Sequence, residues 1–278
     1  MTSTQPPLIA CIGGGNMASA ILGGLLGQGL AAEQLTVVEP SEPARAALHQ
    51  RHGLQAAPDA LAVAPALAHA DLVVWAVKPQ AFRSAAEPVA PHVGAALHLS
   101  VAAGIPTGSI ARWLSTGRIV RAMPNTPALI GQGISGLFAR PEAGAADKAL
   151  IERVMATTGR FLWVQTEAQL DAVTALSGSG PAYVFFFLEA MTQAGEAMGL
   201  TAEQARDLAL ATFSGATELA RRSDESPAEL RARVTSQGGT THAAITHLQQ
   251  QQVGEHFIAA LKAAQARAGE LAAEFGKD

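Results

Sequence analysis

The chain has 278 residues, of which 49% are hydrophobic and 15% charged, with a net charge of −4. This length suggests one large domain or two smaller ones, and it allows a core that needs no disulfide or metal. No run of Lys or Arg stands out, and there is one cysteine, Cys11, so we expect no nucleic-acid surface, no internal disulfide and no metal site.

The first residues, MTSTQPPLIACIGGGN, lack the basic region and the cleavage site of a signal peptide. No apolar run reaches the roughly 18 residues that would suggest a membrane span. We therefore expect a cytoplasmic protein without a membrane partner.

Short apolar runs alternate with helix-like segments through residues 1–166. The runs lie at 8–12, 35–39, 71–77, 97–103, 118–123, 134–139 and 161–165. Strands separated by helical segments predict a Rossmann-type parallel sheet covered on both faces. Between them, the Ala-rich stretch 56–70 is expected to form surface loop and short helix.

The first strand leads into Gly-Gly-Gly-Asn-Met-Ala at residues 13–18, which fits the pattern G-x-G-x-x-G/A. Gly13 allows a tight turn, Gly15 lets the backbone approach a pyrophosphate, and Ala18 lets the helix pack closely on the sheet. The helix start, with Asn16 and Met17, would present free N–H groups to the phosphates. These residues predict a dinucleotide site, although a tight turn without a ligand also fits the pattern.

The second strand ends at Glu39, which is placed to accept a hydrogen bond from the ribose 2′-OH of NAD(H). Ser41 and Arg45 follow closely and offer an alternative, since they could hold the 2′-phosphate of NADP(H). The pattern leaves the choice between NADPH and NADH open, and Glu39 could also serve only as an acid at a helix start.

Two further segments lie at the ends of predicted strands. Because ligands bind beyond the carboxyl ends of parallel strands, we expect both segments to contact the cofactor. For the first segment, the alternative is that Lys78 is simply exposed to solvent. For the second, it is a strand end followed by a turn, with no ligand. The expected contacts are Ala76, Val77, Lys78 and Pro79 in the first segment, and Met123, Pro124 and Asn125 in the second.

Helix signals replace strand signals after residue 166. Three segments, beginning at Thr166, Ser226 and Thr201, fit the capping-box spacing, with Gln or Glu three residues later. Pro181 is expected near the start of another helix, and residues 255–274 are also helical in pattern. We therefore predict two domains, residues 1–166 and residues 167–278, of which the second is all-helical.

The motifs GGGNMASAI, AVKPQ, RAMPNTPALIGQG, ALSGSGPAYVFFFLEAM and VTSQGGTTHAAI resemble, in this order, pyrroline-5-carboxylate reductases. The resemblance covers about residues 8–275. It implies a helical domain that forms a homodimer, larger rings of dimers, and reduction of Δ1-pyrroline-5-carboxylate to L-proline with NADPH or NADH. Relatives often carry an Asn before the AVKP segment, and residues 54–71 contain none, so that contact is not expected here.

The loop SQGGTT matches the substrate loop of that family. The resemblance implies that it binds the substrate carboxylate at a helix N-terminus through Ser236, Gly238, Gly239 and Thr240, and that the Thr241 hydroxyl lies near the ring nitrogen. His242 is an alternative acid, which we expect to face solvent or to be structural.

Other functions fit parts of the sequence. A β-hydroxyacid-type dehydrogenase would need a lysine in the helical domain, and after residue 166 the lysines are Lys262 and Lys277, both near the end. A nucleotide sensor would keep the glycine loop but would not need GGTT. An imine reductase with another substrate stays open.

Overall fold

The computed structural model describes residues 6–277, which form two compact units. One unit contains the residues up to Ser179 together with those from Ala264 onward. The other contains Gly180–Ala263. Among the described residues, no helix is long and apolar enough to cross a membrane.

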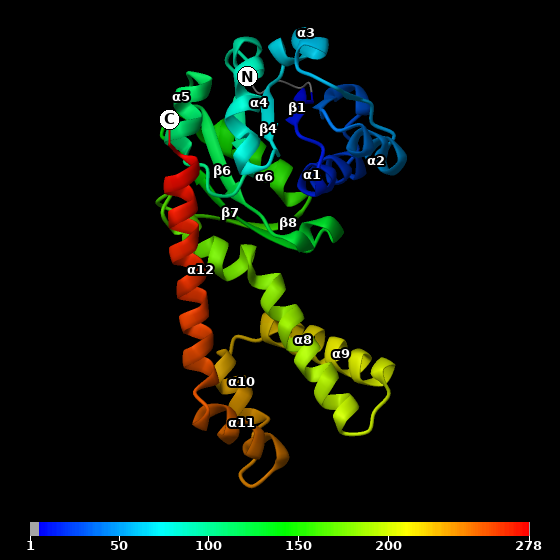
Figure 1. Cartoon of the computed structure of the whole chain (residues 1–278), viewed down its shortest axis with the longest axis vertical. Helices are drawn as coiled ribbons and strands as arrows, with labels where there is room; N and C mark the ends of the chain where they lie inside the picture. The colour runs from blue at the N-terminus through cyan, green and yellow to red at the C-terminus, as the bar shows by residue number, and fades with distance from the viewer. Residues whose placement is uncertain (1–5, 278) are drawn as a thin grey trace. The chain divides into compact units, whose positions relative to one another are not determined.

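The first unit is built on one eight-stranded sheet with the order β3-β2-β1-β4-β5-β6-β7-β8 (Figure 1). The strands are β1 Ile9–Ile12, β2 Leu35–Val38, β3 Ala56–Ala57, β4 Leu72–Trp75, β5 Leu97–Ser100, β6 Ile119–Met123, β7 Gly133–Ala139 and β8 Gly159–Trp163. All seven expected strands are present. The expectation for 56–70 was wrong in one respect, because Ala56 and Ala57 pair with Val37 and Val38 as a short edge strand.

One pair of strands departs from the expected parallel order, since β6 and β7 are antiparallel. The connection between them, residues 124–132, is shorter than the dozen or so residues that a parallel crossover needs. The chain therefore turns back directly, and β8 then runs parallel to β7.

Helices cover both faces of the sheet, as expected. The helices and short 3-10 turns of this unit are α1 Asn16–Gly27, η1 Ala32–Gln34, α2 Glu42–His52, η2 Leu61–Val63, α3 Ala64–Ala68, η3 Pro79–Ala81, α4 Phe82–Val89, η4 Ala90–His92, α5 Thr107–Leu114, η5 Thr126–Ile130, α6 Ala145–Ala156 and α7 Gln169–Val173. The α2 helix ends at Gly53, whose left-handed φ of 70° suits glycine.

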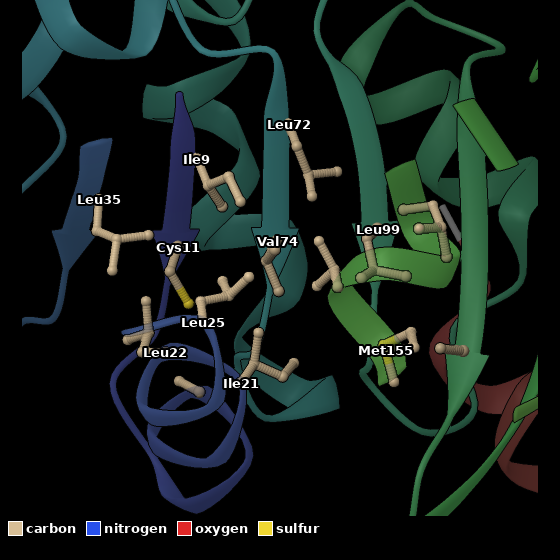
Figure 2. Close-up of a cluster of buried hydrophobic side chains, with 14 of the residues drawn as sticks. Ile9, Cys11, Ile21, Leu22, Leu25, Leu35, Leu72, Val74, Leu99 and Met155 are labelled. Atoms are coloured by element: carbon tan, nitrogen blue, oxygen red, sulfur yellow. The ribbon is translucent and has the colours of Figure 1, made fainter. Parts of the chain in front are cut away.

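Two hydrophobic clusters hold these layers together. The first contains side chains of α1, α2 and α6 packed on one face of the strands, and Figure 2 shows Ile21, Leu22 and Leu25 of α1 beside strand residues such as Cys11 and Val74. The second contains side chains of α3, α4 and α5 on the other face, including Phe82. Side chains that alternate along a strand go to opposite faces, so β1 serves both clusters: Cys11 faces the first and Ile12 the second.

The chain after β8 is helical, as predicted. It forms α7, a π-helical turn η6 Thr174–Gly178, α8 Gly180–Ala197, α9 Ala202–Arg222, α10 Pro227–Arg233, α11 Thr240–Gln250 and α12 Val253–Phe275. The α12 helix begins in the second unit and ends in the first.

Two of the three predicted capping boxes are complete. The hydroxyls of Thr201 and Ser226 accept hydrogen bonds from the backbone N–H groups of Gln204 and Glu229. The third was wrong, because α7 begins only at Gln169, whose side chain accepts from the backbone N–H of Thr166.

The second unit buries very few side chains in the single chain. Within residues 180–263, all of which the structure describes, the buried hydrophobic residues are Ala205 and Ala209. Large hydrophobic side chains stay exposed: Val184, Phe185, Phe186, Met191, Met198, Leu200, Leu208, Leu210, Leu219, Val234, Leu248 and Ile258. An apolar surface of this kind marks a contact with another molecule.

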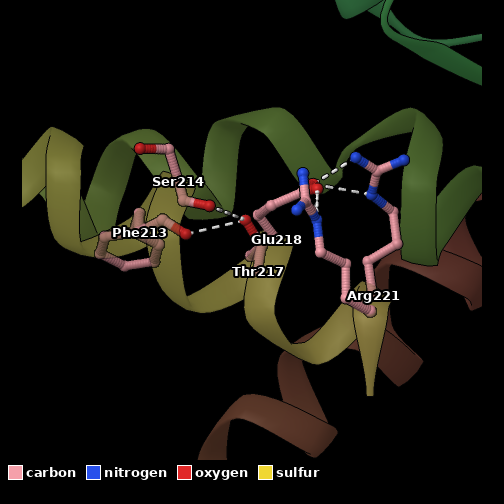
Figure 3. A network of polar contacts seen from close by, with 6 residues as sticks. Phe213, Ser214, Thr217, Glu218 and Arg221 are labelled. Atoms are coloured by element: carbon pink, nitrogen blue, oxygen red, sulfur yellow. Dashed lines mark hydrogen bonds and ion pairs between the residues drawn. The ribbon is translucent and has the colours of Figure 1, made fainter. Parts of the chain in front are cut away.

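The carboxyl half of α9 also carries a polar cluster. Glu218 accepts hydrogen bonds from the guanidinium groups of Arg221 and Arg222, and the Thr217 hydroxyl bonds the carbonyls of Phe213 and Ser214 (Figure 3). These hydrogen bonds lower the pKa of Glu218, and the bond from Arg221 has the largest effect. The same helix therefore presents both a charged cluster and exposed leucines.

Candidate functional site

The residues expected to bind the cofactor gather at one edge of the sheet. Strands β2, β1, β4, β5 and β6 are parallel, so their carboxyl ends lie together. The backbone ties the segments to one another there: Gly13 N–H donates to the Val38 carbonyl at 2.8 Å, and Ala76 N–H donates to the Ile12 carbonyl at 2.8 Å. The glycine loop, Glu39 and the AVKPQ segment are thus neighbours.

The glycine loop needs glycine at position 13 and has open space at position 15. Gly13 has φ +98°, and a Cβ built on it would lie 2.6 Å from the carbonyl oxygen of Ala76. A Cβ on Gly15 would meet no atom within 4 Å. The α1 helix begins at Asn16, with no side-chain cap at Gly15 and no acidic residue in its first turn. The start of α1 thus has no side-chain cap and open space beside Gly15, which fits the pyrophosphate of a dinucleotide.

Glu39 links the glycine loop to the turn after β2. Its two carboxylate oxygens accept hydrogen bonds from the backbone N–H groups of Gly14 at 2.6 Å and Ser41 at 2.7 Å. A Cβ on Gly14 would lie 3.0 Å from Cγ of Glu39, so the glycine gives the acid room to lie over the loop. No role for Gly14 was predicted from the sequence. The run of three glycines was the available signal.

Burial raises the pKa of the Cys11 thiol to about 12, and the negative charge of Glu39 adds to this. The thiol lies beneath the loop, where it bonds the Gly13 carbonyl oxygen at 3.3 Å. Cys11 is therefore a protonated, buried core residue.

The AVKPQ segment leaves the sheet as expected. Strand β4 ends at Trp75, and Lys78 is exposed at the start of η3, where Pro79 takes the first position. Lys78 is therefore accessible to a ligand at the carboxyl edge.

Asn125, after β6, holds two segments together. Its side-chain oxygen accepts from the Ile134 N–H at 3.0 Å, and its amide nitrogen donates to the Ser177 carbonyl at 3.2 Å. The amide thereby joins the start of β7 to the π-helical turn η6, a role the sequence analysis did not predict.

The π-helical turn also lies against Met123. A Cβ on Gly178 would stand 2.5 Å from Cε of Met123, so only glycine allows this contact without a shift. Short π-helical segments occur frequently at functional sites. The SGSGPAY motif thus helps to place the Met-Pro-Asn segment.

A buried arginine supports the same segment from β6. Arg121 is only 3% exposed, and its guanidinium lies 3.1 Å from the Glu167 carboxylate. Glu167 also accepts from the backbone N–H and the hydroxyl of Thr107, at 2.7 and 2.6 Å. Burial raises the pKa of the nearby Asp171, while Arg121 lowers it and Glu167 raises it further. No local pattern predicted this network, because its members are far apart in the chain.

The loop SQGGTT forms the approach to α11 in the second unit. Gly238 has φ +76°, Gly239 is the N-cap, and the helix begins at Thr240 with no side-chain cap. The N-terminus expected for the substrate carboxylate is therefore present. Thr241 and His242 are both exposed.

Two family models match the chain. The one described as pyrroline-5-carboxylate reductase dimerisation matches residues 167–271, and the one described as NADP oxidoreductase coenzyme F420-dependent matches residues 8–104.

Curated proteins of one name match over nearly the full length. The pyrroline-5-carboxylate reductase of Pseudomonas aeruginosa is 45% identical over 273 residues, covering 98% of this chain and 99% of the relative. That of Haemophilus influenzae is 40% identical, covering 96% and 98%. Among solved structures, a pyrroline-5-carboxylate reductase from Coxiella burnetii superposes with a TM-score of 0.88 at 38% identity, covering 96% and 99%. A pyrroline carboxylate reductase from Plasmodium falciparum with NADP bound has a TM-score of 0.85 at 26% identity, covering 96% and 98%.

Proposed function

This chain belongs to the pyrroline-5-carboxylate reductase family, and we propose which of its residues carry out the reaction of that family. The chain is an NAD(P)H-dependent oxidoreductase that reduces Δ1-pyrroline-5-carboxylate to L-proline, the last step of proline biosynthesis. The bound nicotinamide supplies the hydride that goes to C5. The observation that carries this conclusion is the 45% identity to the pyrroline-5-carboxylate reductase of Pseudomonas aeruginosa over 98% of the chain.

The cofactor residues are those of the carboxyl edge. Gly13 and Gly15 shape the loop, and the N–H groups at Asn16 and Met17 face the pyrophosphate. The space in front of Gly15 and the uncapped start of α1 support this assignment. The other residues of the site contact the ribose, the phosphates or the nicotinamide. They are Glu39, Ser41, Ala76, Val77, Lys78, Pro79, Met123, Pro124 and Asn125.

The substrate is held by the loop before α11. Ser236, Gly238, Gly239 and Thr240 bind its carboxylate, and this assignment is supported by the uncapped helix N-terminus. The Thr241 hydroxyl orients the ring nitrogen. If the imine binds in its protonated form, the protein need not deliver a proton during hydride transfer.

Positioning then dominates the chemistry. Good orientation of two reactants lowers a barrier by about 7–11 kcal/mol. A general acid contributes roughly 10²–10⁴-fold in rate, which is less. A loop with two threonines and an exposed histidine is adequate for such a reaction.

The helical part makes the protein a homo-oligomer, consistent with the dimerisation family. The exposed apolar residues of the second unit support a dimer built through this part. We further propose that dimers assemble into a larger ring and that the enzyme works in the cytoplasm. Residues 1–166 and 167–278 are proposed as its two functional domains, and the start of the dimerisation match at residue 167 supports that division.

The experiment is a comparison of initial rates of NADH and NADPH oxidation with Δ1-pyrroline-5-carboxylate for wild type, Thr241→Ala and Thr241→Ser. We expect rapid oxidation by wild type, a large loss in Thr241→Ala with unchanged cofactor affinity, and substantial recovery in Thr241→Ser. Equal rates in all three would remove Thr241 from the mechanism. Folded wild type that binds cofactor without oxidising it would contradict the function.

A further inference from the structure

A cavity of about 270 Å³ lies beside α1 in the first unit. Its walls come from α1, the end of α2, the turn η5 and the residue that follows α6. None of the residues that we assign to the cofactor or the substrate lines it. A water molecule takes up about 30 Å³ of liquid volume, so the cavity has room for a ligand of several non-hydrogen atoms.

Two consecutive glycines in the interior of α1 shape one wall of this cavity. A Cβ on Gly23 would lie 2.5 Å from Cε1 of His52, and a Cβ on Gly24 would lie 2.6 Å from Oγ1 of Thr157. Glycine in the interior of a helix is destabilising relative to alanine. The close approach of His52 to α1 therefore depends on a residue that a helix disfavours.

The polar side chains of the cavity are joined by hydrogen bonds. Ser19 is 8% exposed, and its Oγ lies 2.8 Å from Nε2 of His52. A guanidinium nitrogen of Arg51 also donates to this Oγ, at 3.4 Å. Burial lowers the pKa of His52, and the charge of Arg51 lowers it further, so the ring is neutral at pH 7. The hydroxyl and the neutral ring have two protons between them and use one for their mutual bond, so the other can be donated to a ligand.

The chemistry of the lining favours an anion. Among the described residues that line the cavity, the ionisable ones are Arg51 and His52, and both are basic. A guanidinium has five N–H donors in a planar fork, which matches the oxygens of a phosphate or a carboxylate. Leu129 adds an apolar wall that can contact a short carbon chain.

The walls of the cavity are bonded to two cofactor residues. The backbone N–H of Ser19 donates to the carbonyl of Gly15 at 2.9 Å, and that of Ala128 donates to the carbonyl of Asn125 at 3.1 Å. An anion that shifts Ser19 or η5 therefore changes the cofactor site. Linkage then requires that the cofactor change the affinity for the anion by the same factor.

We propose that Ser19, Arg51 and His52 form a binding site for a small phosphate or carboxylate, separate from the cofactor and substrate sites. The test is calorimetric titration of the full-length protein with inorganic phosphate and with malonate at constant ionic strength. The protein is first saturated with NADH, so that neither probe can bind at the glycine loop. We expect saturable binding of at least one probe, and the tighter one identifies the class of anion.

Two pairs of variants locate the binding. Arg51→Ala should weaken it about tenfold or more, because a hydrogen bond to a charged group is lost. Arg83→Ala removes an exposed arginine from α4 and should leave it unchanged. Gly23→Ala should also weaken binding, because its methyl group would displace His52. Gly27→Ala, whose methyl group would enter open space at the end of the same helix, should not. Alanine favours a helix over glycine, so neither glycine variant should lose its fold.

Wild type that binds neither probe would overturn the proposal. So would Arg51→Ala or Gly23→Ala that binds the probe as tightly as its control, since the anion would then lie elsewhere, for example at the substrate loop. The titrations contain no pyrroline substrate, so they do not depend on turnover. A failed activity assay would challenge the proposed function alone.

Discussion

Gly13 lies directly beneath the carbonyl oxygen of Ala76, so a side chain at position 13 would begin only 2.6 Å from that oxygen. This contact joins the glycine loop to the segment after β4, and backbone atoms cannot move aside as a side-chain tip can. Gly13→Ala would also need to keep φ +98°, which L-residues rarely adopt. We expect it to lower the free energy of unfolding by about 1–3 kcal/mol, the usual cost of a strained backbone. Urea denaturation measures this.

Gly15→Ala is the matched comparison, because its Cβ would enter empty space and its φ of −71° suits any residue. Stability should change by no more than about 1 kcal/mol, the effect of alanine at an N-cap. Cofactor binding should weaken markedly in titrations, since the methyl group occupies the approach of the phosphates. Unchanged affinity in this variant would mean that the phosphates do not lie at Gly15.

Asn125 offers a second test, at the other end of the site. Asn125→Ala leaves the Ile134 N–H and the Ser177 carbonyl, both partly buried, without their partner; the cost should be about 1 kcal/mol, the low end for unsatisfied groups. Asn125→Asp keeps the bond from Ile134 but sets a carboxylate against the Ser177 carbonyl. Its stability should recover as the pH falls and the acid becomes a donor. Denaturation at pH 5 and pH 8 distinguishes this outcome from a general loss of packing, which would not depend on pH.

His98 makes stability depend on pH. Its ring is fully buried on β5, with Nδ1 accepting from the Trp75 indole N–H at 3.1 Å. Burial lowers the pKa of His98 to about 4, and the charge of Arg118 contributes. The folded state therefore keeps the ring neutral where the unfolded state, with an ordinary pKa near 6.5, takes up a proton. The stabilisation is complete above pH 6.5 and is lost as the pH falls toward 4, by about 3 kcal/mol in total.

The measurement is the free energy of unfolding of wild type and His98→Gln between pH 7.5 and pH 4. Glutamine does not titrate and can still accept from Trp75. We expect the difference between the two proteins to shrink or reverse as the pH falls. Parallel pH profiles would show that His98 does not contribute to acid sensitivity.

Phe185 tests the oligomer. It lies on α8 and is 64% exposed in the single chain. Phe185→Glu should place a charge in the apolar contact and shift the protein toward monomer in sedimentation velocity, because an unpaired buried charge is strongly unfavourable. Ala202→Glu adds the same charge in the polar first turn of α9 and should leave the sedimentation coefficient unchanged.

The parts of the site that follow from local patterns were predictable. Gly13 and Gly15 lie between a short apolar run, which forms a fully buried strand, and a helix with period 3.6. The parallel order of the strands then brings Glu39 and Lys78 to the same edge. The pairing of Ala56 and Ala57 was not predictable, because two alanines carry no alternation. The antiparallel turn into β7 depends on a connection whose length the apolar runs left uncertain.

Contacts between distant residues were beyond any local pattern. The bond from Asn125 to the Ser177 carbonyl joins residues 52 apart, and the bonds from Thr107 to Glu167 join residues 60 apart. From its neighbours in the sequence alone, each of these residues could equally be part of a turn, a helix cap or a charged side chain exposed to solvent. Only tertiary packing identifies Arg121 as a buried cation that needs Glu167.

The first unit is not continuous in sequence, since it includes residues from Ala264 onward. Phe275 packs against its second hydrophobic cluster, and the Ser109 hydroxyl donates to the Gly276 carbonyl at 2.9 Å. During synthesis on the ribosome, the first unit therefore cannot complete its second hydrophobic cluster until residues 264–276 have been made. Until then, apolar surface of the second cluster on the α5 side of the sheet is exposed in the nascent chain, and such surface is prone to aggregation.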